Sequence, residues 1–575
     1  MGQLVYKIMK RLTHLIEGLD YRKLFLVLII VWMGLNFIQA LFMEVMSDEA
    51  YYFLYGRHLA WGYFDHPPMV GLMTWLSALL FDGNLSVRFA TVILHSFTLL
   101  VVWKIIEEKL PDAKKTVLFF VIASSLIMFQ IFGFITAPDA PFLFFAALFF
   151  LFYRNFLRHE SWTNTLLLAL SMAGMIYSKY HAFLVIGFVV ASNFRLLAKP
   201  KCWVAVLLTA LLLAPHIYWQ VSMGFPSFRY HLVDRSGGFH WRNLLIYLPN
   251  QLVIFNPLTF GAVVYVIVKK KSKDLFERGL FFIIIGFFSF FWLMTLKGHV
   301  EPHWTVVCSI PVAVLLYHQS LCDIKLRKFV KNWIFPSLFV IFFVRIIFLT
   351  DLLPEELGFN GEKNEVEAIE SIAGHLPVVF TGSYQNPSGY LFFAGKESFV
   401  LSAVNSRQTQ FDIWQNELKY QGKPVFVGQK MDGKSVEYQL NGNSFYGYTA
   451  TEFQSVNRVK IQFTLPQAEL CTGDTLTIDF KMFNPTSYDI NFQHAEFPVS
   501  CKAAYTSEEK LAKTLFSNCT LNREIELLPA NATVTGSLST VVPDLNPAGY
   551  LFALTLDNTL CCANNSAFVR IKIRD

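Results

Sequence analysis

The chain has 575 residues, of which 54% are hydrophobic and only 16% are charged, and its net charge is +6. A soluble protein carries about a quarter charged residues, so these values exclude an ordinary soluble domain and predict a membrane protein with a more polar part. The positive residues lie in short clusters between apolar runs, which is typical of cytoplasmic loops and not of a nucleic-acid-binding surface.

Long apolar runs, separated by turn-rich or charged breaks, fill the first 350 residues. About 20 residues cross the hydrocarbon core of a bilayer. We therefore expect about eleven helices, near residues 24–43, 85–103, 116–135, 140–157, 165–178, 182–197, 203–221, 246–268, 279–296, 304–318 and 333–350. The basic stretch 1–22 precedes the first run without the cleavage site of a signal peptide, so this helix is expected to stay as an anchor.

Alternate loops between these runs are basic, namely the N-terminus and residues 104–115, 154–158, 195–201, 269–273 and 325–331. The positive-inside rule places these loops in the cytoplasm, and everything after about Asp351 outside it. That outer part contains Cys471, Cys501, Cys519, Cys561 and Cys562. Such clustering fits an oxidising compartment, so we expect at least one disulfide, whose pairing the sequence leaves open.

The composition changes after Thr350. Residues 351–455 mix helical and strand-like patterns and predict an extracytoplasmic α/β region. From residue 456 onward, alternating strand-length segments bounded by turns predict a small β-sandwich. The expected organisation is a transmembrane domain at 1–350, an α/β region at 351–455 and a β-sandwich-like domain at 456–575.

Acidic residues gather in the loops opposite the basic ones. Asp48 and Glu49 follow the first apolar run, and Asp139 lies in the break T-A-P-D-A-P between two later runs. Charged groups at a membrane edge are costly and usually functional. Such a carboxylate can take the proton from an acceptor hydroxyl in an inverting glycosyl transfer. The alternatives are an interfacial acid pair that caps a helix for Asp48 and Glu49, and a plain N-cap for Asp139.

Cations on the same face can stabilise a leaving phosphate. Asp65 and His66 stand in a rigid D-H-P-P turn, which is either structural or aims His66 at a lipid phosphate. Lys179 and the adjacent Tyr180 lie in a tight outer hairpin, where the lysine either binds phosphate or reaches lipid headgroups. Further candidates for substrate binding are Arg229, His231, Arg235, Glu301 and His303.

No cofactor and no metal site are predicted. Seven histidines face outward on the expected topology: His58, His66, His181, His231, His240, His299 and His303. Their spacing matches no known ligand pattern. A functional divalent metal is therefore kept only as an alternative.

The motifs form an ordered set: D-E-A-Y-Y from Asp48, F-D-H-P-P from Phe64, T-A-P-D-A-P from Thr136, G-M-I-Y-S-K-Y from Gly174, H-V-E-P-H-W from His299, S-Y-Q-N-P-S-G-Y-L-F-F from Ser383 and N-S-R-Q-T-Q-F-D-I-W from Asn405. This set resembles the bacterial branch of the dolichyl-phosphate-mannose protein mannosyltransferase family. That family shares the C-type glycosyltransferase membrane fold with the lipid A aminoarabinose transferases. The resemblance implies a polyprenyl- or dolichyl-phosphate sugar donor on the outer membrane face, with Asp48 as the base and Asp139 as a second essential acid.

The resemblance covers about Asp48 to Trp414 and leaves residues 456–575 outside it. The sequence thus predicts an inverting glycosyltransferase that spans the bacterial inner membrane many times, with its C-terminal domain in the periplasm or outside. The expected acceptor is lipid A or lipopolysaccharide, another cell-envelope glycan or a protein hydroxyl. The rival interpretation is a transporter or flippase of lipid-linked sugars. Transporters usually show inverted repeats and charges near the bilayer midplane, neither of which is evident here.

Overall fold

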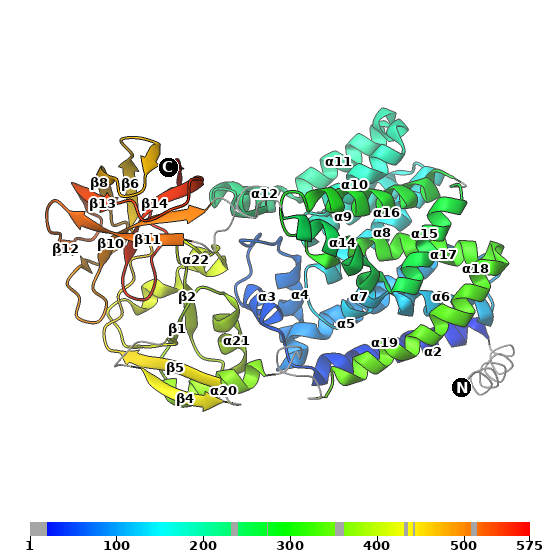
Figure 1. The fold of residues 1–575 in the computed structure, drawn as a ribbon. Helices are drawn as coiled ribbons and strands as arrows, with labels where there is room; N and C mark the ends of the chain where they lie inside the picture. The colour runs from blue at the N-terminus through cyan, green and yellow to red at the C-terminus, as the bar shows by residue number, and fades with distance from the viewer. Residues whose placement is uncertain are drawn as a thin grey trace. The chain divides into compact units, whose positions relative to one another are not determined.

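A computed structural model gives the fold and describes residues 20–231, 240–272, 274–350, 361–429, 435–440, 443–507 and 514–574. The chain divides into two compact units. The first comprises Met1–Arg229 and His240–Asn360, and the second comprises Tyr230–Phe239 and Gly361–Asp575. Figure 1 shows helices in the first unit and sheets in the second.

The first unit is a bundle of apolar helices. Among the described residues, six helical runs are long and apolar enough to cross a membrane: α2 (Tyr21–Phe42), α5 (Asn84–Ile106), α8 (Asp139–Arg158), α16 (Leu275–Met294), Pro302–Cys322 and Ile324–Ile347. The run Pro302–Cys322 contains α17 (Ser309–Cys322). The run Ile324–Ile347 contains α18 (Ile324–Phe329) and α19 (Phe335–Ile347). Two bent pairs raise the number to at most eight: α11 (Pro200–Leu212) with α12 (Ala214–Ser222), and α14 (Trp241–Phe255) with α15 (Pro257–Lys269).

The prediction of a multi-pass helical membrane protein is confirmed, but the count of about eleven is not. The shorter helices are α3 (Ser47–Arg57), α4 (Met69–Ala78), α6 (Ala113–Ser125), α7 (Ile127–Ile131), α9 (Trp162–Ser178), α10 (Ala182–Ser192) and α13 (Pro226–Arg229). Leu126 has extended backbone angles (φ −86°, ψ 96°) and splits the expected span 116–135 into α6 and α7.

Two expected single helices are broken. The run 203–221 bends by 50° between α11 and α12, and the run 246–268 bends by 102° between α14 and α15. At the second break Asn256 has a positive φ of 63° and is followed by Pro257. A proline has no backbone N–H to continue the preceding helix but is well suited to start the next one, so the chain turns there.

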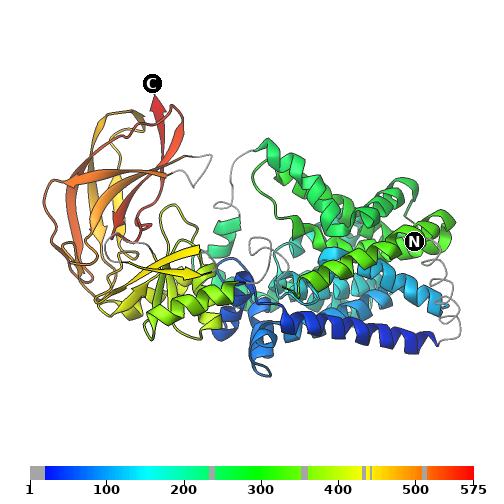
Figure 2. The same ribbon diagram turned by 60° about the horizontal axis from the view of Figure 1, so that its bottom comes forward.

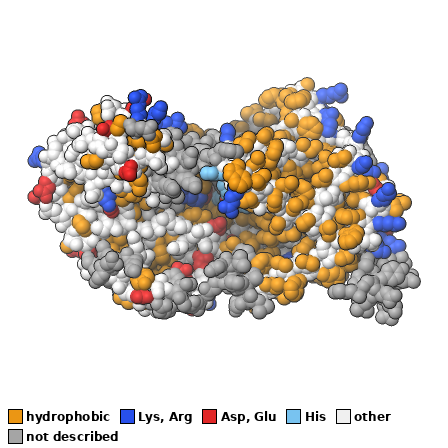
Figure 3. Space-filling view, viewed as in Figure 1, with side chains coloured by type: hydrophobic (Ala, Val, Ile, Leu, Met, Phe, Trp, Pro, Cys, Tyr) orange, Lys and Arg blue, Asp and Glu red, His pale blue; other side chains and the backbone are white. Residues whose placement is uncertain are grey.

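Apolar side chains cover much of the face of the helical unit that is visible in Figure 3. In the apolar 18-residue stretch of α2, only 28% of the residues are buried within the protein. In the corresponding stretch of Ile324–Ile347, only 17% are buried. The core itself is built from large side chains on several helices, among them Phe119, Phe150 and Tyr317. An apolar outer surface over an apolar core is what a lipid environment requires.

The two ends of the helical unit differ in charge. Asp139 begins α8 and Arg158 ends it. The Arg154 side chain, one turn earlier, donates to the main-chain oxygens of Lys104 and Ile105 at the end of α5, so α5 and α8 end side by side. Lys and Arg side chains gather at this end of the unit in Figure 3. The acidic loops therefore lie at one end of α8 and basic residues lie at the other.

The second unit contains two main sheets. The five-stranded sheet has the order β2-β1-β3-β5-β4, with β1 (Val378–Thr381), β2 (Ser398–Leu401), β3 (Val425–Val427), β4 (Val436–Leu440) and β5 (Asn443–Ala450). Strand β1 is parallel to β2 and β3, whereas β5 is antiparallel to β3 and β4. The helices α20 (Glu362–Ala373), α21 (Gln385–Phe393) and α22 (Gln410–Trp414) belong to the same region.

The eight-stranded sheet has the order β6-β8-β13-β11-β10-β14-β15-β7. Its strands are β6 (Lys460–Thr464), β7 (Glu469–Cys471), β8 (Thr475–Phe483), β10 (Ser500–Ser507), β11 (Thr514–Leu521), β13 (Thr533–Val541), β14 (Gly549–Asp557) and β15 (Val569–Arg574), and a small pair, β9 (Ile490–Asn491) with β12 (Leu527–Leu528), lies apart. Buried and exposed residues alternate along β8, which is the period of a sheet with one face on the core. Figure 2 shows this sheet as a curved layer, and the predicted C-terminal β-rich region is confirmed.

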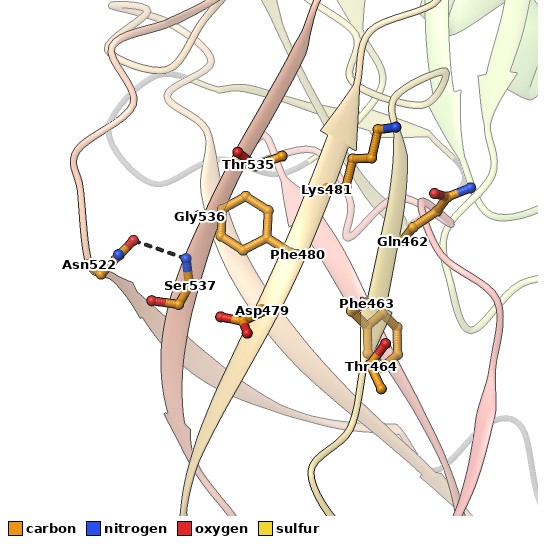
Figure 4. Close-up of a pocket in the computed structure, with 10 residues that line it drawn as sticks. All are labelled: Gln462, Phe463, Thr464, Asp479, Phe480, Lys481, Asn522, Thr535, Gly536 and Ser537. Carbon is orange, nitrogen blue, oxygen red and sulfur yellow. Dashed lines mark hydrogen bonds between the residues drawn. The ribbon is translucent and has the colours of Figure 1, made fainter.

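A shallow hollow of about 600 Å³ lies over β6, β8 and β13 (Figure 4). Its lining is mostly polar and includes Asp479 and Lys481, two positions apart on β8. The Asn522 side-chain oxygen accepts a hydrogen bond from the Ser537 main-chain N–H at 3.0 Å. The lining does not bring a second carboxylate or a histidine to Asp479, so we place the candidate active site in the first unit.

Candidate active site

A buried ion pair connects the two acidic loops of the first unit. Arg88, four residues into α5, donates from Nε to Glu49 Oε1 at 2.8 Å, and its Nη2 contacts Glu49 Oε2. Both side chains are fully enclosed. Glu49 Oε1 also accepts from the main-chain N–H of Thr136 at 2.8 Å. The glutamate thus joins the start of α3 to the loop that leads to Asp139.

Arg88 also fixes the chain just before α3. Its guanidinium donates to the main-chain oxygens of Met43 at 2.6 Å and Glu44 at 2.8 Å. Because a planar guanidinium offers five donors in a rigid fork, it can hold a carboxylate and several carbonyls together. The Glu49 carboxylate is therefore engaged by the hydrogen bonds from Arg88 and Thr136. The Asp48 side chain, by contrast, is half-buried in the first turn of α3. Of these two neighbouring acids, Asp48 is therefore the more exposed.

Asp139 is held by a second buried ion pair. Lys179, at the end of α9, donates from Nζ to both carboxylate oxygens of Asp139 at 2.7 Å. The two side chains are only 7% and 3% exposed. His303 Nε2 lies 3.8 Å from Asp139 Oδ2, and the ring of His303 meets that of Phe132 edge-on. Three of the predicted site residues, from distant parts of the sequence, thus converge.

The D-H-P-P turn is anchored by tyrosines of α3 and of the following loop. The Tyr55 hydroxyl donates to Asp65 Oδ1 at 2.5 Å, and the rings of Tyr55 and Tyr63 stack with centroids 3.8 Å apart. Burial raises the pKa of Tyr55 well above its ordinary value, and burial raises the pKa of Tyr63 to about 12. Both phenols therefore stay protonated and act as donors. Asp65 is buried by these contacts, while His66 is half-buried and lies 3.3 Å from the Tyr52 hydroxyl.

Tyr180 belongs to a hydrogen-bonded network that joins α12 to the same turn. Its hydroxyl lies 3.1 Å from His216 Nε2 and accepts from Gln220 Nε2 at 3.0 Å. The other ring nitrogen of His216 lies 2.6 Å from the Trp61 main-chain oxygen. Gln220 also donates to Ser227, whose hydroxyl donates to the Tyr63 main-chain oxygen at 2.8 Å. Burial raises the pKa of Tyr180, so this phenol too is neutral.

The remaining predicted residues are more peripheral. Glu301 lies 3.5 Å from His299 Nε2 in an exposed pair. Arg229 ends α13 and is exposed. His231 is half-buried in the second unit, beside the ring of Tyr230. Arg235 lies outside the described residues. Within the part of the chain that the structure describes, no three His, Cys, Asp or Glu side chains gather as metal ligands.

Four residues of these networks were not predicted from the sequence: Arg88, Tyr55, His216 and Gln220. Arg88 could have been singled out, because it is a lone arginine near the start of an apolar run. An ionisable residue at such a position usually has a charged or polar partner. Its partner lies 39 positions away, and no local pattern indicates that pairing. Tyr55 and His216 carry no such signal, because tyrosine and histidine are common at membrane interfaces.

Two comparisons bear on this arrangement. The sequence profile described as dolichyl-phosphate-mannose-protein mannosyltransferase matches residues 65–219. The solved structure of ArnT from Cupriavidus metallidurans in the apo state is similar with a TM-score of 0.54 at 13% identity, covering 74% of this chain and 98% of that one. The chain has the C-type glycosyltransferase fold. The family resemblance that the motifs predict is confirmed.

The C-type fold is also seen in ArnT from Cupriavidus metallidurans bound to undecaprenyl phosphate, with a TM-score of 0.53, 12% identity and coverage of 73% of this chain and 97% of that one. No similar sequence was found among curated proteins. The profile match spans Asp65, His66, Asp139, Lys179 and Tyr180. Asp48 and Glu49 precede it.

Proposed function

We propose that the protein is an inverting membrane glycosyltransferase, which moves a sugar from a polyprenyl-phosphate-linked donor to an acceptor hydroxyl outside the cytoplasm. The observation that carries the proposal is the convergence of Asp48, the Glu49–Arg88 brace and the Asp139–Lys179 pair at one end of an apolar bundle. A polar site at a membrane edge suits a donor whose lipid tail stays between helices while its phosphate reaches the interface.

Asp48 is the proposed general base. The acceptor oxygen attacks the anomeric carbon, the bond from that carbon to the phosphate oxygen breaks, and the hydroxyl proton passes to the Asp48 carboxylate. The leaving polyprenyl phosphate keeps the bonding electrons and gains negative charge. A base that takes the proton in the transition state contributes a rate factor of about 10²–10⁴.

The other residues receive supporting roles. His66 and Arg229 are proposed to face the leaving phosphate, because fixed positive charge stabilises charge that develops in the transition state. Lys179 neutralises Asp139, which accords with a second essential acid that must stay ionised in a buried place. Glu49 positions Asp48 through its bonds to Arg88 and to the Thr136 main chain.

The donor class is supported by the profile match and by the ArnT structure that contains undecaprenyl phosphate. We propose that the protein lies in the bacterial inner membrane with residues 351–575 outside the cytoplasm. The proposed acceptor is lipid A or lipopolysaccharide, another envelope glycan or a protein hydroxyl.

The test is single-turnover transfer by purified protein in detergent, supplied with polyprenyl-phosphate sugars and an extract of envelope acceptors. We expect wild-type protein to release polyprenyl phosphate only when an acceptor is present, and Asp48→Asn to release almost none. Lys271→Gln, at the exposed basic loop, serves as the matched control and should transfer normally. Equal release by wild type and Asp48→Asn would refute the assignment of the base.

A further inference from the structure

Two cysteines of the eight-stranded sheet lie directly across from each other. Strands β10 and β11 are antiparallel, with Lys502 opposite Asn518 and Ala503 opposite Ser517. Continuing this register by one residue places Cys501 opposite Cys519. These strands are the two central ones in the sheet order.

The side chains of Cys501 and Cys519 interact with each other. A hydrogen bond between the two side chains is the largest influence on the pKa of each, and neither cysteine is in a disulfide in this structure. Directly opposite residues on antiparallel strands have Cα atoms about 4.5–5.5 Å apart. Disulfides bridge Cα separations of about 4.4–6.8 Å, so the register inferred for Cys501 and Cys519 is compatible with one.

The neighbourhood of Cys501 and Cys519 makes one thiol the attacker and the other the resolver. Cys501 is buried in the sheet core, whereas Cys519 is half-buried and reachable from solvent. The hydrogen bond from Cys501 lowers the pKa of Cys519. The thiolate is the nucleophile in disulfide exchange, so the more accessible sulfur is also the more reactive one.

We propose that Cys501 and Cys519 form a disulfide in the native protein and that the oxidant is a protein disulfide of the cell envelope. The Cys519 thiolate attacks one sulfur of that disulfide and displaces the other as a thiolate. Cys501 then loses its proton and attacks the Cys519 sulfur, which displaces the second thiolate. Two protein thiols are oxidised, and one oxidant disulfide is reduced to two thiols.

This pairing rests on the proposed function in one respect, namely that the second unit lies outside the cytoplasm. It resolves the choice among five outer cysteines that the sequence leaves open. The other three have different cross-strand neighbours or positions: Cys471 lies opposite Arg574, Cys562 lies opposite Asp557, and Cys561 precedes Cys562. A bond between the two central strands would restrict the unfolded chain and stabilise the whole sheet.

Peptide mapping of the full-length protein can test the pairing directly. Protein purified from cells lysed in an alkylating reagent is digested with trypsin without reduction. Cys501 then lies in peptide 482–502 and Cys519 in peptide 514–523, while Cys471 and the Cys561–Cys562 pair fall in 461–481 and 524–570. We expect peptides 482–502 and 514–523 as one linked species that separates on reduction. Alkylated Cys501 and Cys519, or either one linked to another peptide, would overturn the proposal.

A second measurement covers variants that fold poorly. Reduced wild-type protein treated with oxidised glutathione should form the internal bond with only a transient adduct. Cys501→Ser should instead keep one glutathionyl group on Cys519, and Cys562→Ser should behave as wild type. Equal adduct lifetimes in wild type and Cys501→Ser would contradict the attacker and resolver roles. If the peptides are linked but the preparation has no transfer activity, only the proposed function is contradicted. If Cys501 and Cys519 are free thiols in an active preparation, only the disulfide is contradicted.

Discussion

Replacing Lys179 by Met removes the cation that contacts both carboxylate oxygens of Asp139 and leaves His303, at 3.8 Å, as a more distant neighbour. The methionine keeps most of the apolar stem, so packing changes little. The carboxylate of Asp139, 3% exposed, is left without the two 2.7 Å bonds from Nζ. Breaking a buried ion pair by removing one partner costs about 3–5 kcal/mol, because the remaining charge stays desolvated. Neither group is exposed enough for solvent to reduce this value.

We therefore expect Lys179→Met to lower the free energy of unfolding by about 3–5 kcal/mol. The measurement is a denaturant titration in detergent, followed by the fluorescence of the membrane unit. The double variant Lys179→Met with Asp139→Asn should recover part of the loss, since it leaves no unpaired charge. Lys363→Met is the matched control, because its ion pair with Glu367 is exposed and such pairs contribute about 0–1 kcal/mol. A Lys179→Met protein as stable as wild type would refute the buried pair and return Lys179 to phosphate binding.

Asp48→Asn should lower the transfer rate by about 10²–10⁴ while leaving the unfolding curve unchanged, as measured by product formed per minute; activity within threefold of wild type would move the base elsewhere. Glu49→Gln should lower both stability and transfer, since it leaves Arg88 without its carboxylate; thermal unfolding in detergent checks this, and an unchanged midpoint would contradict the brace. Single cysteines placed beside Asp48 and at Lys271 should react with an impermeant reagent from opposite sides of the membrane, and reaction from the same side would overturn the topology.

The fold class could be predicted from the sequence, because the patterns that indicate it involve residues close together in the chain. Apolar runs of bilayer length predict helices, and alternation along β8 predicts a strand with one buried face. The breaks were harder to place. Pro257 offered a visible signal for the 102° bend, but nothing in the residues around Leu126 indicates that one helix ends there and another begins.

The candidate site was partly accessible for the same reason. Asp48, Asp139 and Lys179 stand out as charges beside apolar runs. Their partners do not, because the contacts join residues far apart in the sequence. Arg88 meets Glu49 across 39 positions, and Lys179 meets Asp139 across 40. Such pairings appear only once the helices are packed, so a residue's role beside its partner cannot be predicted from its own surroundings in the sequence.

Comparative mass spectrometry of envelope lipids and glycans tests the proposed transfer most directly. Cells that produce wild-type protein are compared with cells that produce Asp48→Asn at the same level. We expect the variant cells to lack a sugar-sized mass on one class of envelope molecule and to accumulate the matching polyprenyl-phosphate sugar. Identical profiles from the two strains, with both proteins correctly inserted in the membrane, would contradict a glycosyltransferase that depends on Asp48.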